Sequence, residues 1–153
     1  MKTRKLITLL LALVTLFAVM ASAVSCGDDF DGDGWVEKNE KTMKSATYKK
    51  FNDERYYSVA VEGTITVTVE IVTESGEIGA EVYRKELPDA PIYSVAIYKN
   101  DDGKLVADVV DGGVTQVVEF DSKLTDTFTI TSDGDYVIHI KGINHKGSYK
   151  FEW

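Results

Sequence analysis

Acidic side chains spaced at intervals of two lie near the start of the chain, a pattern suited to holding a metal ion. In the stretch DFDGDGWVEKNE, residues 29–40, three aspartates precede a glycine and a glutamate ends the stretch. Carboxylate oxygens at this spacing wrap around one Ca²⁺ ion, and the glycine permits the sharp turn of such a loop. The predicted calcium ligands are Asp29, Asp31, Asp33, the carbonyl group of Trp35, Glu37 and Glu40.

These twelve residues resemble the calcium loop of an EF-hand or of a dockerin. Glu40 stands where that loop has a bidentate carboxylate, and Val36 fills its apolar eighth position. The setting departs from the family. An EF-hand loop follows a helix, but if the chain is cleaved before Cys26, as argued below, only residues 26–28 precede this loop. A dockerin has a second such loop, and none follows here. A second interpretation stays open, in which the stretch is an acidic, flexible tether that is naturally rich in Asp and Gly.

Other residues with catalytic potential are few. His139 and His145 are the only histidines. His139 alternates with apolar residues and should point away from the core, and His145 lies in an expected turn, so the pair is a weak zinc candidate. No serine lies in a Gly-x-Ser-x-Gly motif, and no feature selects a pair of carboxylates for glycoside hydrolysis. The sequence predicts that the protein is not an enzyme, with a glycan-active enzyme as the minor alternative.

Aromatic residues offer a binding chemistry instead. An exposed aromatic strip on a sheet face can stack on sugar rings, although tyrosines also fill sheet faces and edges for structural reasons. The alternation of the strands assigns Tyr57, Tyr93, Tyr136 and Tyr149 to core faces. The candidates for such a strip are Trp35, Tyr48, Tyr56, Tyr83 and Tyr98, which are not all expected to fit in the core.

The first 25 residues have the composition of an export signal. Three basic residues precede an apolar run over 6–20, and small residues follow over 21–25. The run is shorter than the roughly 20 residues that a membrane-spanning helix needs. The sequence therefore predicts an exported protein.

The residues AVSC, 23–26, resemble the lipobox of bacterial lipoproteins. In that family a cysteine is lipidated and becomes the first residue of the mature chain, which implies that Cys26 anchors this protein to a cell membrane on its extracytoplasmic side. The alternative is ordinary cleavage after residues 21–23, which would leave a free thiol. The lipobox interpretation explains why the chain has one cysteine.

Removal of residues 1–25 leaves 128 of the 153 residues, the size of one domain. This segment carries three basic and no acidic residues, so the net charge changes from −8 to −11. Such an excess argues against nucleic acid or a bare anionic membrane as a partner, because both are polyanions. We expect a monomer without disulfides, stabilised by its core.

Alternating residues after Tyr56 predict strands. In the segment 65–71, apolar residues at odd positions alternate with Thr and Glu. The chain then shows short strands between Gly- and Asp-rich turns, and further turns are predicted at 74–77 and 143–147. This pattern predicts an all-β fold, a single antiparallel β-sandwich of about eight strands of the jelly-roll or immunoglobulin-like type. The predicted organisation is a signal peptide (1–25), an acidic tether or calcium loop with a short helix or coil (26–47), and the sandwich (48–153).

The segment SDGDYVIHIKGINHKGSYKFEW is similar to the closing hairpin of bacterial pre-peptidase C-terminal-like domains. The matching residues are Gly134, Tyr136, Gly147, Tyr149 and Phe151. The resemblance implies a non-catalytic accessory or binding module. The sequence thus predicts a membrane-anchored lipoprotein that binds an unknown protein or glycan; the alternative is a calcium-dependent structural or interaction module that uses residues 29–40.

Overall fold

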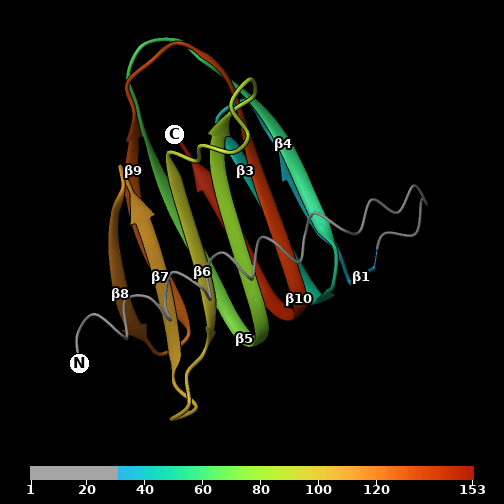
Figure 1. The fold of residues 1–153 in the computed structure, drawn as a ribbon. Helices are drawn as coiled ribbons and strands as arrows, with labels where there is room; N and C mark the ends of the chain where they lie inside the picture. Colours follow the sequence, from blue (N-terminus) through green and yellow to red (C-terminus); the bar gives the residue numbers. More distant parts are fainter. Residues whose placement is uncertain (1–30) are drawn as a thin grey trace. The chain divides into compact units, whose positions relative to one another are not determined.

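The computed structural model describes residues 31–153, which form one compact unit. The predictions for the export signal, Cys26 and Asp29 lie outside these residues. The described chain forms ten strands, all paired antiparallel, which confirms the all-β prediction (Figure 1). No helix in this part of the chain is long and apolar enough to cross a membrane. The strands are β1 (Gly32–Asp33), β2 (Val36–Asn39), β3 (Met43–Phe51), β4 (Glu54–Val61), β5 (Ile65–Arg84), β6 (Tyr93–Lys99), β7 (Leu105–Asp111), β8 (Val114–Phe120), β9 (Lys123–Ile130) and β10 (Gly134–Glu152).

The two longest strands fold the sheet into two layers. The first half of β5 pairs with β9 and its second half with β6. Likewise β10 pairs first with β4 and then with β3. One layer contains β9, the first half of β5, the second half of β10, and β3 with its partners β1 and β2. We call it the β3 layer. The β6 layer contains β4, the other halves of β10 and β5, and then β6, β7 and β8 in that order.

Each long strand bends where the sequence pattern predicted a turn. The segment 74–77 lies inside β5 and the segment 143–147 inside β10, so the prediction of turns there is wrong. Gly76 and Asn144 take left-handed backbone angles, with φ of 76° and 48°, and the pairing of the two strands shifts register beside them. Residues that favour turns also permit a paired strand to change direction, which is what they do here.

The buried side chains change phase at this bend. In β5, Val67, Val69 and Ile71 are buried before it, and Ile78 and Val82 after it. The shift from odd to even positions keeps apolar residues between the layers although the strand has changed layer. The core tyrosines are placed as predicted: Tyr57, Tyr93, Tyr136 and Tyr149 are at most 3% exposed.

The amino-terminal part of the described chain also differs from expectation. The short helix or coil predicted within 26–47 is wrong for residues 36–39 and 43–47, which belong to β2 and β3. Ala46 and Tyr48 are buried while Thr47 between them is exposed, a period of two that suits a strand. The second half of β10 supplies the edge on which β3 pairs.

Candidate functional site

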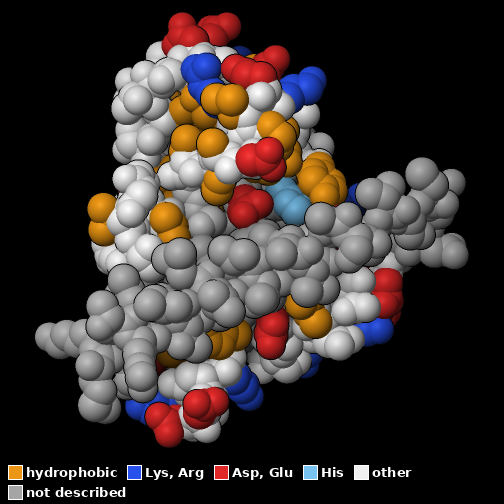
Figure 2. All heavy atoms as spheres, in the orientation of Figure 1, with side chains coloured by type: hydrophobic (Ala, Val, Ile, Leu, Met, Phe, Trp, Pro, Cys, Tyr) orange, Lys and Arg blue, Asp and Glu red, His pale blue; other side chains and the backbone are white. Residues whose placement is uncertain are grey.

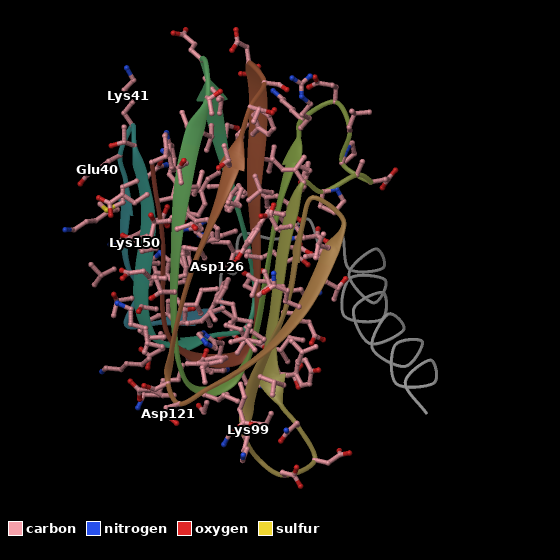
Figure 3. The ribbon with its side chains drawn as sticks, turned by 90° about the vertical axis from the view of Figure 1, so that its left-hand side faces the viewer. Glu40, Lys41, Lys99, Asp121, Asp126 and Lys150 are labelled. Carbon is pink, nitrogen blue, oxygen red and sulfur yellow. The ribbon has the colours of Figure 1, made fainter. Side chains whose placement is uncertain are left out.

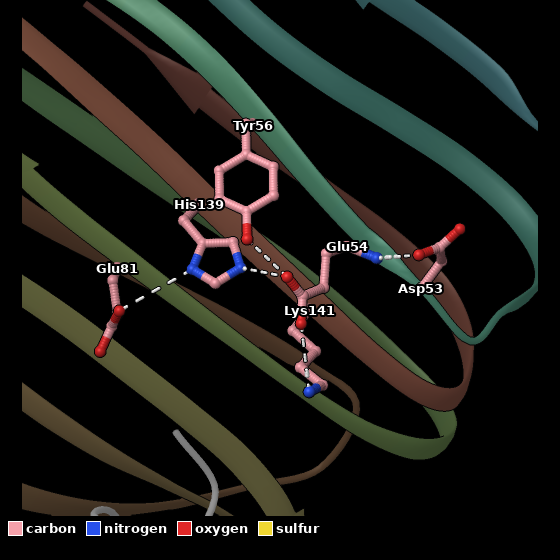
Figure 4. Close-up of polar contacts among 6 residues, drawn as sticks. All are labelled: Asp53, Glu54, Tyr56, Glu81, His139 and Lys141. Carbon is pink, nitrogen blue, oxygen red and sulfur yellow. Dashed lines mark hydrogen bonds and ion pairs between the residues drawn. The ribbon is translucent and has the colours of Figure 1, made fainter. Parts of the chain in front are cut away.

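A cluster of polar and aromatic side chains lies on the outer face of the β6 layer. Tyr56 of β4 and Glu81 of β5 are both paired with His139, which lies between them on β10. Two residues along, Glu54 of β4 is paired with Lys141 of β10. Figure 4 shows these five side chains meeting on one face, because directly opposed residues in an antiparallel sheet point the same way.

The ring of Tyr56 lies on the ring of His139. The centroids are 4.3 Å apart and the ring planes differ by 5°. Tyr56 remains 58% exposed, whereas His139 is 7% exposed. One face of the phenol ring is therefore fixed against the protein, and the side chain still presents a large surface to solvent.

The carboxylate of Glu54 holds this arrangement together. Its Oε2 accepts hydrogen bonds from the Tyr56 hydroxyl at 2.5 Å and from His139 Nε2 at 3.2 Å, and its Oε1 lies 3.2 Å from Lys141 Nζ. Burial raises the pKa of Glu54, but the hydrogen bonds from Tyr56 and Lys141 and the electrostatic interactions with His139 and Lys141 outweigh it, so the pKa of Glu54 lies below its ordinary value. The ionised carboxylate requires that Nε2 of His139 carries a proton.

Glu81 stands on the other side of the imidazole. Its Oε2 is 3.9 Å from His139 Nδ1, beyond hydrogen-bonding distance. Burial, the hydrogen bond to Glu54 and the charges of Glu54 and Glu81 raise the pKa of Tyr56 above its ordinary value, so the hydroxyl stays protonated at neutral pH. The cluster thus combines a neutral aromatic ring with two carboxylates and one ammonium group.

More aromatic residues border the cluster on the same face. Tyr83 is two residues along β5 from Glu81, and its pKa is raised by burial and by the charges of Glu81 and Glu54. Tyr98 of β6 donates a hydrogen bond to Asp108 of β7 at 3.1 Å. Figure 2 shows hydrophobic and acidic side chains gathered around a histidine on this side of the molecule. Three of the five candidates for an aromatic strip, Tyr56, Tyr83 and Tyr98, therefore share one face, whereas Tyr48 is buried in the core.

The geometry suits hydrogen bonding to a ligand better than metal binding. Glu54 and Glu81 face opposite nitrogens of His139, so the imidazole separates them and the three groups do not converge on one point. Within residues 31–153 no group of three or more His, Cys, Asp or Glu side chains is arranged to hold a metal ion.

Two of the predicted calcium ligands, Asp33 and Glu37, lie in the short strands β1 and β2. Asp33 is paired with Lys50 of β3, and Glu37 with Ala46. Four residues of β3 therefore separate them, about 13 Å at roughly 3.3 Å per residue. Glu40 lies beyond the end of β2 and is exposed.

The side chains of this segment have other partners. Asp31 forms an ion pair with Lys50 at 3.2 Å. Glu37 accepts hydrogen bonds of 2.9 Å from Trp35 Nε1 and from Arg55. The structure does not bring Asp31, Asp33, Trp35, Glu37 and Glu40 together around one point, and Asp29 is outside the described residues, so calcium binding stays a prediction.

His145 is fully buried, so the expectation of an exposed histidine in a turn is wrong. Its Nδ1 is 2.8 Å from the Tyr48 hydroxyl and its Nε2 is 3.0 Å from Thr73 Oγ1. Burial lowers the pKa of His145 to about 4, so the ring is neutral at pH 7. This histidine fills the bend between the layers and has a structural role.

A polar cleft lies at one end of the sandwich. Its volume is about 560 Å³, and Figure 3 shows two of its lining residues, Lys99 and Asp121, at the end opposite Glu40 and Lys41. An ion pair of 2.6 Å between Lys104 and Glu119 crosses part of its lining. Its lining is mostly polar and charged, with Phe120 as its one aromatic residue, whereas the Tyr56 ring is stacked on His139 and surrounded by carboxylates, so the Tyr56 cluster is the better candidate for ligand binding.

Comparison with known proteins does not assign this chain to a family. No protein-family model matches the chain, and no curated protein matches it at a significant level. Among solved structures, the chain is similar to a carbohydrate-binding module of lichenase 5A from Cellvibrio mixtus, solved with cellotriose. The two are 16% identical, the match covers 82% of this chain and 86% of that one, and the TM-score is 0.33. A likeness of this size carries no argument about a ligand.

Glu54, Glu81 and Lys141 were not selected from the sequence as site residues. Each lies at an outward position of an alternating strand, and so do many other charged residues of this chain. What distinguishes them is the register of β4, β10 and β5, which places them beside His139. The alternating pattern of this strand predicted correctly that His139 points away from the core. It gave no information about which residues of the neighbouring strands lie beside His139.

Proposed function

We propose that this protein is a non-catalytic binding module whose ligand is a glycan and whose binding surface is the outer face of the β6 layer. The observation that carries the proposal is the ring of Tyr56, which is held against His139 on one side and is 58% exposed. A rigid aromatic ring binds the apolar face of a pyranose with little loss of side-chain entropy.

Polar groups beside the ring supply the hydrogen bonds that a sugar needs. The carboxylate of Glu81 accepts from ligand hydroxyl groups, and Lys141 donates to ring or hydroxyl oxygens. Glu54 has a different role, because its oxygens already accept from Tyr56 and His139. We assign it the positioning of the ring.

The charges around the ring favour an uncharged sugar. Glu54 and Glu81 place two carboxylates beside Lys141, and the whole chain has a net charge of −8. Uronic acids and sulfated sugars would be repelled by this surface. Neutral polysaccharides are therefore the ligands to test first.

Binding is measured by affinity electrophoresis of the protein in gels that contain neutral or acidic polysaccharides. We expect a neutral polysaccharide to retard the unsubstituted protein, Tyr56→Phe to retain most of the retardation because the ring remains, and Tyr56→Ala to lose it. Val36→Ala, at a site 65% exposed on β2, is the matched control. Equal retardation of Tyr56→Ala and the unsubstituted protein would place the ligand elsewhere.

We further propose that the module works at the outer side of a bacterial membrane, attached through lipid on Cys26. The residues AVSC at 23–26 and the apolar run before them support this. Lipid attachment adds about 0.8 kcal/mol per buried methylene, and more than one acyl chain is needed for stable anchoring. We expect Cys26→Ser to abolish fatty-acid labelling and to release the protein from the membrane fraction; persistent labelling would disprove lipidation at Cys26.

A further inference from the structure

Strand β8 forms an open edge of the β6 layer. Among the described strands it pairs only with β7, and its other edge leaves backbone N–H and C=O groups without a strand partner. Val114 and Val117 are 62% and 54% exposed. An exposed strand edge with β-branched residues is a ready surface for pairing with another strand.

This edge carries fewer charged residues than the edge strands β2, β4 and β9. In its seven residues, VTQVVEF, the only charged residue is Glu119, which is neutralised by Lys104 at 2.6 Å. Two charged residues lie in each of the edge strands β2, β4 and β9. Proline, lysine and bulges are common protections of an edge, and β8 has none of them.

The sequence of β8 is complementary to itself. Val117 is the midpoint of the strand, so a twofold axis there pairs all seven residues of two copies in antiparallel register. Val117 then faces Val117 of the second copy and Gln116 faces Val118, while Thr115 faces Glu119 and Val114 faces Phe120. No like charges oppose each other, and Glu119 meets a hydroxyl group that can donate to it.

From this complementarity we propose that two copies of the protein pair through β8, forming one continuous sheet from their two β6 layers. A twofold axis that makes adjacent strands antiparallel stands perpendicular to the sheet, so the same face of both copies lies on the same side. The two Tyr56 clusters would then face one way and bind one extended ligand together. The pairing itself does not depend on what the cluster binds.

Pairing through β8 departs from the monomer expected from the sequence, and it would be weak in dilute solution. One strand pair buries little surface, and two acidic chains repel each other at long range. Attachment to a membrane would raise the local concentration and favour the paired form. A covalent trap is therefore the suitable measurement.

Cysteine substitutions in the full-length chain, oxidised in intact cells and separated on a non-reducing gel, test the register. We expect Val117→Cys to give a disulfide-linked dimer, because this position meets itself across the axis. Thr115→Cys and Glu119→Cys alone should give only the background of the unsubstituted chain, which contains Cys26. In the proposed register, residue 115 of one copy lies four residues, about 13 Å, along the strand from residue 115 of the other copy. The same holds for residue 119, and this distance is too long for a disulfide. Both substitutions in one chain should restore the dimer, since they face each other.

A charge at the axis provides the second test. Val117→Lys, added to the chain that contains both Thr115→Cys and Glu119→Cys, places two ammonium groups against each other and should abolish the cross-link. Val36→Lys, at a valine on β2 that is 65% exposed, should leave it unchanged. Thermal unfolding of each variant confirms that it is folded. Cross-linking that is absent or equal at all positions, or linkage to a protein of different mass, would overturn self-pairing through β8.

Discussion

The phenol ring of Tyr56 lies parallel to the imidazole of His139, with 4.3 Å between the centroids and 5° between the planes. The two residues are directly opposed on β4 and β10, so the sheet register alone brings them together. Glu54 then fixes both, because one of its oxygens accepts from the phenol and from the imidazole. The orientation of the exposed ring is therefore set by three strand positions rather than by a loop.

Removing the support of the ring should weaken ligand binding without removing the ring. We expect His139→Ala to lower the affinity for the bound polysaccharide about two- to tenfold, since a stacked aromatic pair contributes about 0.5–1.5 kcal/mol. Affinity electrophoresis over a range of polysaccharide concentrations measures the change. Thr125→Ala, at an exposed position of β9 in the other layer, is the control. An unchanged affinity for His139→Ala would show that the stack does not orient the binding surface.

His145 should make the stability of the fold depend on pH. Burial lowers the pKa of His145 to about 4 in the folded protein, while the unfolded chain takes up the proton near the ordinary value of about 6.5. Between these values the unfolded state binds more protons, so the free energy of unfolding falls as the pH falls, by at most about 1.4 kcal/mol per pH unit.

Urea denaturation between pH 6.5 and pH 5 measures this dependence. We expect His145→Gln to be less stable at pH 7, because Tyr48 and Thr73 lose their present partner. Over the acidic range its stability should change less than that of the unsubstituted protein. The same slope in both proteins would assign the pH dependence to other groups.

Alternation along the chain was enough to predict an all-β fold and the four core tyrosines. It works because one face of each strand is buried and the side chains have a period of two. The same rule placed His139 outward. It could not show that Glu54 and Glu81 flank this histidine, because alternation within a strand says nothing about its register against its neighbours.

The bends of β5 and β10 were predicted as turns for a related reason. Glycine and asparagine at positive φ serve a tight turn and a bent, paired strand equally well, and only the partner strand decides between them. Here each long strand is the partner of the other on both sides of the bend. His145 was expected at the surface because its segment looked like a turn, yet the bend encloses it between the layers.

A calcium titration followed by tryptophan fluorescence tests the loop at 29–40. In the structure β1 and β2 are extended along β3, and Trp35 is stacked on Tyr48 with 5.0 Å between centroids. Wrapping the loop around an ion would require these strand pairs to separate. If the predicted loop binds calcium, the tryptophan fluorescence should change saturably by millimolar calcium, and no change would exclude the site. A saturable change that Glu40→Gln removes would show that the segment refolds into a calcium site.

Gly147 should be among the least replaceable residues of the fold. Its φ is 150°, and a Cβ atom there would lie 1.9 Å from the carbonyl oxygen of Val72 on the paired strand. Because that neighbour is backbone, the clash cannot be relieved by a side-chain rotation, and we expect Gly147→Ala to lower the free energy of unfolding by about 3 kcal/mol or more. Gly103→Ala is the control, since its φ of 75° is also unfavourable but no atom lies within 4 Å of the added carbon. We expect it to cost about 1 kcal/mol. Urea denaturation of both variants measures the difference. Equal decreases in the free energy of unfolding would mean that β10 and β5 can move apart at this point without loss of stability.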